Sequence, residues 1–140
     1  MMGIFVLVLF SVIWSTGFSA VPEGSIRLSG YNHNLYEGRV EMYFHGSWGE
    51  ICSRYFSHLE AQVVCRQLGI RDEAYLARSV AIMDQRYGHG KDGAIIDDIR
   101  CRGNELSLLQ CQLSFCANVT CCPYGTNVGV ICHPPQTIVG

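Results

Sequence analysis

Hydrophobic and polar side chains alternate over several short stretches of this chain, and the alternation predicts strands. Residues 39–44 alternate with a period of two, as a half-buried strand does. A glycine-containing turn at 45–47 leads into another such run at 48–52, so the two runs are expected to pair as a hairpin. Further strands are predicted at 26–28, 94–101 and 128–132.

One segment follows the helical period instead, and it predicts the main helix, over residues 57–68. The apolar stripe of this helix consists of Leu59, Val63, Val64 and Leu68. Ser57 and Glu60 fit a capping box, in which the serine hydroxyl accepts from the Glu60 amide and the glutamate reaches back to the Ser57 amide. Gly69 follows, where a left-handed C-terminal cap belongs.

The rest of the chain is less regular. A short second helix is predicted over 104–110, with Asn104 as its N-cap. Residues 71–92 have mixed polarity and several glycines, and residues 111–127 are rich in cysteine, so both are expected to be loops, the first with a short strand at most. The pattern as a whole predicts an α+β fold, and the residues expected to be buried are Val40, Met42, Trp48, Ile51, Val63, Val64, Leu68, Ile99, Val128 and Val130.

The N-terminus has the pattern of a secretory signal peptide over residues 1–20. Residues 4–14 are almost wholly apolar, and the small residues Ser19 and Ala20 suit cleavage by signal peptidase. The missing basic residue before the apolar run weakens this prediction. The alternative is an uncleaved membrane anchor, although the run is short for a span of about 20 residues. The sequence therefore predicts a secreted, extracellular product, with the cell surface as the alternative.

Charge and motifs exclude two classes of function. Ten arginine and lysine residues oppose twelve aspartate and glutamate residues, and this near-neutral balance argues against a nucleic-acid-binding surface. All the basic residues except Lys91 are arginine, whose fork suits carboxylate, sulfate or phosphate, although exposed charges more often have no partner role. None of the five histidines lies in a nucleophile motif, so we expect no enzyme and no required cofactor.

The chain contains eight cysteines, all between Cys52 and Cys132. An even number behind a hydrophobic leader is typical of a disulfide framework formed in an oxidising compartment. Spacing alone does not select the pairs. A zinc site formed by cysteines 116, 121 and 122 with His133 is disfavoured, because the spacing lacks the separated ligand pairs that structural zinc sites use.

Several motifs in order resemble one family, the scavenger receptor cysteine-rich domain. The matching segments are 38–41, 48–52, 61–69, 87–90, 97–101, 108–111 and 128–132. The resemblance implies a domain over 26–133, followed by a C-terminal tail at 134–140. It also implies a curved antiparallel sheet wrapped around one helix. The implied role is recognition of proteins or polyanionic surfaces, without catalysis.

The resemblance further implies a set of disulfides. The three implied pairs are Cys52 with Cys122, Cys65 with Cys132, and Cys101 with Cys111. Tyr36 and Ile70 occupy the positions where eight-cysteine members of the family have another pair. We expect the remaining two cysteines, Cys116 and Cys121, to pair with each other; the alternatives are free thiols or a bridge between chains.

A weak calcium site is predicted at Asp97 and Asp98, whose carboxylates are the hard oxygen ligands that Ca²⁺ prefers. In the resembling family a third carboxylate comes from the final loop, where this chain has Asn127 instead. The lower charge predicts low affinity, and plain surface carboxylates are the alternative. Arg100 and Arg102 lie next to this pair, and we expect them to contact an anionic ligand.

Asn118 begins the sequon Asn118-Val119-Thr120, which predicts N-glycosylation on an exposed loop of a secreted protein. Early closure of the small cysteine loop around it is the argument against occupancy. The sequence thus favours an extracellular recognition module of scavenger-receptor type. The alternative is a secreted structural or effector protein that uses the same scaffold. A membrane association would require the uncleaved leader or a longer product.

Overall fold

The computed structural model describes residues 20–90, 93–116, 122 and 127–135. The strands are β1 (Ile26–Ser29), β2 (Glu37–Phe44), β3 (Ser47–Ile51), β4 (Val80–Ile82), β5 (Ala94–Arg100), β6 (Gln112–Phe115) and β7 (Gly129–Ile131). The helices are α1 (His58–Gln67), the short α2 (Glu73–Leu76) and the 3₁₀ helix η1 (Leu108–Gln110). These elements confirm the α+β class.

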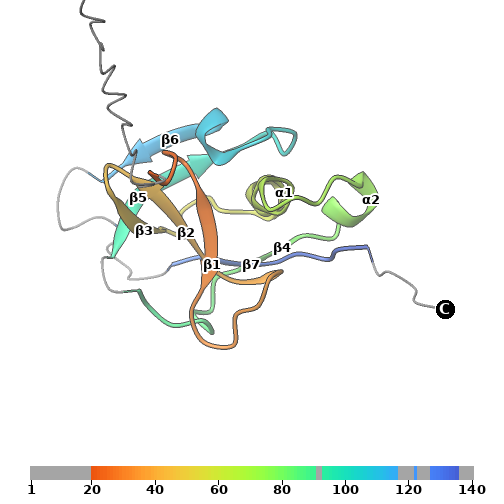
Figure 1. Cartoon of the computed structure of the whole chain (residues 1–140), viewed down its shortest axis with the longest axis horizontal. Coiled ribbons are helices and arrows are strands. Elements are labelled where there is room, and N and C mark those ends of the chain that lie inside the picture. The colour runs from red at the N-terminus through yellow and green to blue at the C-terminus, as the bar shows by residue number, and fades with distance from the viewer. Residues whose placement is uncertain (1–19, 91–92, 117–121, 123–126, 136–140) are drawn as a thin grey trace, which may run out of the picture.

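The strands form one curled sheet in the order β4-β7-β2-β3-β5-β6, with β1 paired to β2. The predicted hairpin is present, because β2 and β3 pair antiparallel across a turn that includes Gly46. All neighbouring strands are antiparallel except β3 and β5, which run parallel. The sheet curls around α1, so that β5 and β6 lie on one side of the helix and β4 and β7 on the other (Figure 1).

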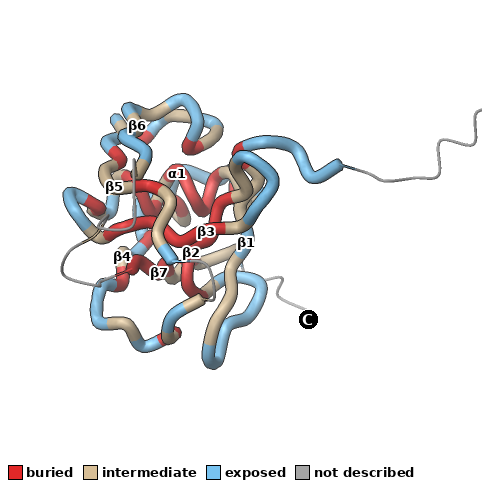
Figure 2. Tube along the Cα trace, turned by 90° about the vertical axis from the view of Figure 1, so that its left-hand side faces the viewer, coloured by how far each residue is buried: buried red, intermediate tan, exposed pale blue. Residues whose placement is uncertain are grey.

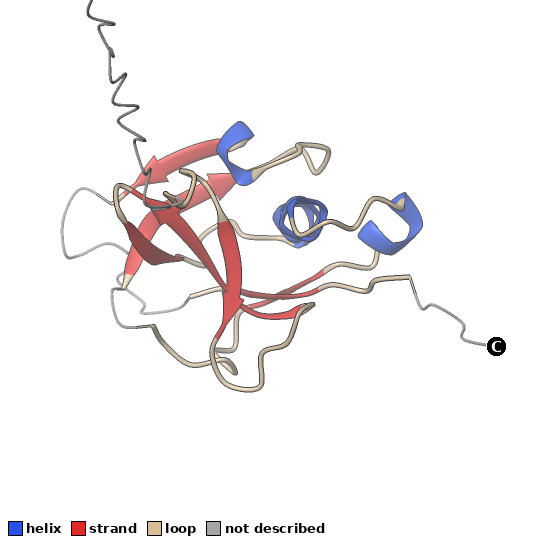
Figure 3. Ribbon diagram, viewed as in Figure 1, coloured by secondary structure: helices blue, strands red, loops and turns tan. Residues whose placement is uncertain are grey.

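The core lies between α1 and the concave side of the sheet (Figures 2 and 3). Eight of the ten residues expected to be buried have 0% exposure: Val40, Met42, Ile51, Val63, Val64, Ile99, Val128 and Val130. Trp48 and Leu68 are only partly buried. Trp48 lies opposite Tyr43, on the outer side of the hairpin, where the Arg27 guanidinium covers its ring at 4.3 Å. Trp48 was expected in the core because its side chain is apolar. Side chains alternate between the two faces of a strand, and this position of β3 faces away from the core.

The caps of α1 follow the sequence, with one shift. Ser57 is the N-cap, but its hydroxyl accepts from the Leu59 amide at 3.2 Å, one residue earlier than predicted. The Glu60 carboxylate lies 3.1 Å from the Ser57 hydroxyl, and burial raises the pKa of Glu60 although hydrogen bonds from Ser57 act in the other direction. Gly69 has a φ of +115°, as the left-handed C-terminal position requires.

The short elements α2 and β6 lie where the sequence predicted loops, while β4 fits the short strand allowed within residues 71–92. The segment 71–92 contains α2 as well as the strand β4, and the segment 111–127 contains β6. These elements have three or four residues, too few to show a period. The helix predicted over 104–110 is only the 3₁₀ turn η1, with Ser107 rather than Asn104 at its N-cap. Asn104 therefore caps no helix.

Three disulfides join described residues: Cys52–Cys122, Cys65–Cys132 and Cys101–Cys111. They are the three pairs that the resemblance implied. The expected pair Cys116–Cys121 includes Cys121, which lies outside the described residues. The sequon at Asn118 and the predicted signal peptide, apart from residue 20, also lie outside them. Among the described residues, no helix has the length and apolar character needed to cross a membrane.

Candidate functional site

Arg39 of β2 lies at the centre of a buried polar network, which we call the Arg39 network. Its guanidinium donates from Nη2 to Glu41 at 2.9 Å and from Nη1 to the Tyr87 carbonyl at 3.0 Å. Its Nε lies 3.3 Å from the carboxylate of Glu50. All three charged side chains are only 6% exposed. Buried charges of this kind need such close partners, so this arginine is committed to the fold.

The loop 83–90 is attached to the sheet through the same network. The Gly90 amide donates to Glu50, and the Asn127 amide nitrogen donates to Glu50 at 3.3 Å and to the Gly88 carbonyl at 2.9 Å. A Cβ atom at Gly90 would lie 2.8 Å from the Glu41 carboxylate. The loop backbone therefore reaches the buried carboxylates because this position has no side chain. The network borders a pocket of about 410 Å³.

A second pocket, of about 480 Å³, lies beside the Cys101–Cys111 disulfide and is called the arginine groove here. It is lined by Arg100, Cys101, Arg102, Asn104, Glu105, Gln110 and Gln112. Both arginines are exposed. The structure thus brings together the two arginines that the sequence marked for ligand contact and adds three amide side chains. Asn104, Gln110 and Gln112 had no pattern that indicated this role.

The Arg100 side chain is oriented but not enclosed. Its guanidinium lies over the Tyr55 ring, 4.1 Å from the centroid, and its Nε lies 3.3 Å from the Asp98 carboxylate. The side chain is still 55% exposed. A cation–π contact at an exposed site contributes about 0.5–1 kcal/mol, enough to favour one orientation of the fork. The remaining N–H groups can donate to a ligand.

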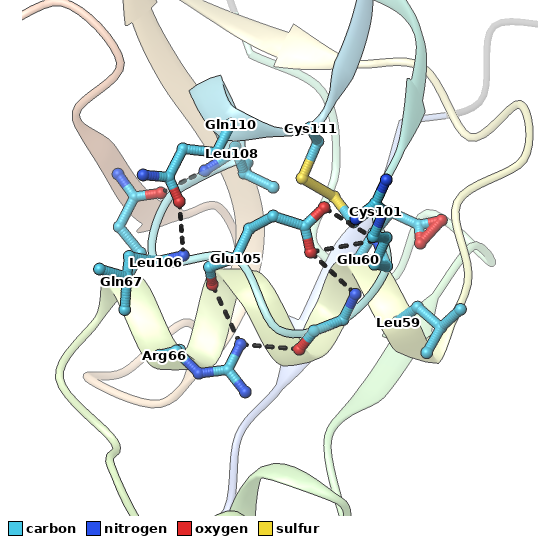
Figure 4. The surroundings of a disulfide bond; sticks show 12 residues. Leu59, Glu60, Arg66, Gln67, Cys101, Glu105, Leu106, Leu108, Gln110 and Cys111 are labelled. Carbon is cyan, nitrogen blue, oxygen red and sulfur yellow. Dashed lines mark hydrogen bonds between the residues drawn. A yellow bond between two sulfur atoms is a disulfide. The ribbon is translucent and has the colours of Figure 1, made fainter.

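Glu105 supports the groove from within. Its carboxylate accepts from the backbone amides of Arg102, at 2.8 Å, and Gly103, at 2.9 Å (Figure 4). Burial acts to raise the pKa of Glu105, but the backbone hydrogen bonds outweigh it and lower the pKa. Glu105 therefore remains ionised with its charge directed at the loop backbone, and the exposed charge of the groove comes from the arginines.

Helix α1 holds the groove loop in place (Figure 4). Arg66 donates from Nη1 to the carbonyls of Gly103, at 2.7 Å, and Glu105, at 3.0 Å. The Gln67 side-chain oxygen accepts from the Leu108 amide at 3.0 Å. Both residues come from the motif of the main helix, but nothing in the local sequence indicated that they reach this loop.

The predicted calcium ligands are not joined into one cluster. Asp98 pairs with Arg100 through Oδ2, while its Oδ1 is buried and has no hydrogen-bond partner in the described part of the chain. An unpartnered carboxylate oxygen fits a hard cation. The Asn127 amide, however, belongs to the Arg39 network. Among the described residues, the one close set of three Cys, His, Asp or Glu groups is Cys101, Glu105 and Cys111, whose two sulfurs are bonded to each other.

Comparison with known proteins gives a consistent picture. A family model, the scavenger receptor cysteine-rich domain, matches residues 30–133. The third such domain of murine neurotrypsin is similar in structure, with a TM-score of 0.62 and 32% identity, over 80% of this chain and 100% of that one. The dimeric form of the domain from mouse MARCO has a TM-score of 0.54 and 29% identity, over 82% of this chain and 95% of that one.

Curated relatives include lysyl oxidase homologues. Lysyl oxidase homolog 4 of Homo sapiens is 40% identical over 109 residues, or 78% of this chain. Lysyl oxidase homolog 2 of Xenopus tropicalis is 38% identical over 112 residues, or 80% of this chain. The chain spans 14% of the length of each of these two relatives.

Proposed function

The chain belongs to the scavenger receptor cysteine-rich domain family, and from this premise we propose that it is an extracellular binding domain whose arginine groove contacts anionic groups on protein or polysaccharide surfaces. Domains of this family are generally extracellular ligand-binding modules without catalysis. The match covers 14% of the length of the lysyl oxidase homologues, so oxidase activity is not part of this proposal.

The observation that supports the proposal is that Arg100 and Arg102 are exposed and can donate to a ligand, whereas the donors of Arg39 are used by the fold. Arg100 and Arg102 are exposed in a groove, and the one carboxylate that lines it, Glu105, is occupied by backbone amides. Arginine forks bind carboxylate and sulfate oxygens in pairs, and the amides of Gln110 and Gln112 can add neutral hydrogen bonds. A secreted location is part of the proposal.

The test is binding of the purified domain to immobilised dextran sulfate at low salt. Arg100→Ala/Arg102→Ala should weaken binding by about 10–100-fold, since hydrogen bonds to charged groups contribute about 1.5–3 kcal/mol and 1.4 kcal/mol is tenfold in affinity. Arg78→Ala/Arg86→Ala is the matched control, because both of its arginines are exposed and outside the groove. It should change affinity by no more than about twofold.

Two outcomes would count against the proposal. Equal weakening in both double variants would mean that only total charge matters. No binding of the wild-type domain to dextran sulfate would favour the alternative, a secreted structural or effector protein without polyanion recognition. Arg100→Lys/Arg102→Lys keeps the charge but loses the planar fork, so an intermediate affinity would assign part of the binding to paired hydrogen bonds.

A further inference from the structure

The arginine groove contains a disulfide as well as two cations. Cys101 lines the groove and follows Arg100 directly, while Arg102 comes next in the chain. Cys101 and Cys111 are both partly exposed. In contrast, each of the other two described disulfides has a buried partner: Cys52 is 4% exposed, and Cys65 and Cys132 are 0% and 3% exposed.

We propose that Cys101–Cys111 is a site of reversible thiol–disulfide exchange with small thiols that carry carboxylates, which Arg100 and Arg102 bind. This rests on the proposed function, because the same arginines supply the anion site. An incoming thiolate is itself anionic, so the groove raises its local concentration twice over. Cationic neighbours such as Arg100 and Arg102 also favour thiolate over thiol at a reacting cysteine, while the Glu105 carboxylate, within 4.8 Å of both sulfurs, acts against them.

The exchange is balanced without any further oxidant or reductant. The incoming thiolate attacks Cys101 Sγ on the groove side and forms a new S–S bond with it. The Cys101–Cys111 bond breaks, and its electron pair leaves on Cys111 Sγ, which then takes a proton from water. One disulfide is lost and one is formed. The reverse attack by the Cys111 thiolate releases the small thiol and restores the original bond.

The groove loop has the contacts to keep its shape when this bond opens. Arg66, Gln67 and Glu105 hold the loop by hydrogen bonds that do not involve either sulfur (Figure 4). The Cys101–Cys111 bond joins residues only 10 apart, whereas Cys52–Cys122 and Cys65–Cys132 join residues 70 and 67 apart. Because a cross-link over a short loop restricts the unfolded chain less, opening this one costs less stability than opening either of the other two.

The adduct would change the groove itself. A mixed disulfide at Cys101 places the carboxylates of the small thiol beside Arg100 and Arg102, and these are the groups that a polyanion would contact. Thiol exchange is therefore expected to compete with polyanion binding.

The experiment treats the folded, oxidised domain with glutathione, whose two carboxylates make it anionic, or with cysteamine, whose amine makes it cationic. Reactions are quenched with acid, free thiols are alkylated, and adducts are located by peptide mapping. Rates are expressed per thiolate. We expect the adduct at Cys101 and the alkylated thiol at Cys111, with glutathione faster by about tenfold at low salt. This preference should disappear in Arg100→Ala/Arg102→Ala and persist in Arg78→Ala/Arg86→Ala.

Glutathione adducts formed first at Cys52, Cys65 or Cys122, or an equal anion preference at Cys116, would overturn the inference. So would an unchanged preference in Arg100→Ala/Arg102→Ala. The dextran sulfate assay separates this failure from that of the proposed function. If polyanion binding depends on the two arginines but the exchange rate does not, the inference is wrong and the proposed function still holds. The adduct should weaken dextran sulfate binding about as much as the arginine variant does, that is by about 10–100-fold.

Discussion

Arg39 and Arg100 lie on two strands of one sheet, but they have opposite surroundings. The Arg39 side chain is 6% exposed and is held by carboxylates, a carbonyl and a hydroxyl. The Arg100 side chain is 55% exposed and has one ion pair and one aromatic ring as partners. The difference teaches that an arginine in a family motif is structural or available for ligands according to how many of its donors the fold already uses.

The comparison is tested most strongly by Arg39→Ala. Removing Arg39 leaves the carboxylates of Glu41 and Glu50 buried with fewer partners, which costs about 3–5 kcal/mol for a broken buried ion pair. Arg100→Ala is the matched variant on the other side, and it should cost no more than about 1 kcal/mol, the upper range for an exposed pair. Urea unfolding of both variants measures this. Similar losses for the two would mean that the Arg39 network carries no special role in stability.

A smaller effect is expected from Gly90→Ala, which places a methyl group against the Arg39 network. Its Cβ atom would lie 2.8 Å from the Glu41 carboxylate and 3.1 Å from that of Glu50, so the loop must shift at a cost of about 1–3 kcal/mol. Gly90 does not have a positive φ, so the loss would come from crowding; Gly46→Ala is the opposite case, because Gly46 has a φ of +85° and no atom within 4 Å of such a Cβ, so its loss would come from backbone strain alone. If Gly90→Ala unfolds at the same temperature as wild type, the loop does not depend on close approach to the carboxylates.

The smallest effect concerns the two adjacent carboxylates of β5, Asp97 and Asp98. We propose that Asp98, with Asp97, binds Ca²⁺ weakly, because Asp98 Oδ1 is buried and lacks a hydrogen-bond partner among the described residues. With a dissociation constant of about 10⁻⁴–10⁻³ M, millimolar Ca²⁺ should stabilise the domain by about 0.4–1.4 kcal/mol. Calorimetry and melting curves should show this for wild type and for Asp84→Asn, an exposed control, but not for Asp98→Asn. Identical curves with and without Ca²⁺ in wild type would end the proposal.

The sequence predicted the long, periodic elements well. The hairpin of β2 and β3 and the helix α1 follow from alternation and a capped apolar stripe, and eight of the ten residues named for the core are fully buried. The short elements α2 and β6 could not be predicted, and β4 only as a short strand without bounds, because three or four residues do not define a period. The disulfide pairs came from the family resemblance, since spacing alone leaves many pairings open.

The site was predictable only in part. Arg100 and Arg102 were named because they lie next to the acidic pair Asp97 and Asp98, and both line the groove. The role of Asn104 was wrong, because the Leu106 amide, which an N-cap at Asn104 would have served, donates to Gln110 Oε1 at 2.9 Å, and no α-helix starts there. The contacts of Arg66 with the groove loop join residues 37 and 39 positions apart, and no local pattern contains that information.

The Cys65–Cys132 bond has a mechanical consequence for the groove. It joins α1 to the end of the last strand, so residues 66–131, the groove included, lie inside one covalent loop. A force that pulls residues 20 and 135 apart is carried along the chain to Cys52, from which two covalent routes reach Cys132: across Cys52–Cys122 and along residues 122–132, or along residues 52–65 and across Cys65–Cys132. Neither route includes residues 100–112, so the groove backbone bears none of the final covalent tension while both bonds are intact. A domain that is anchored at both ends and stretched by flow would thus unfold β1 and β2 before its groove is stretched.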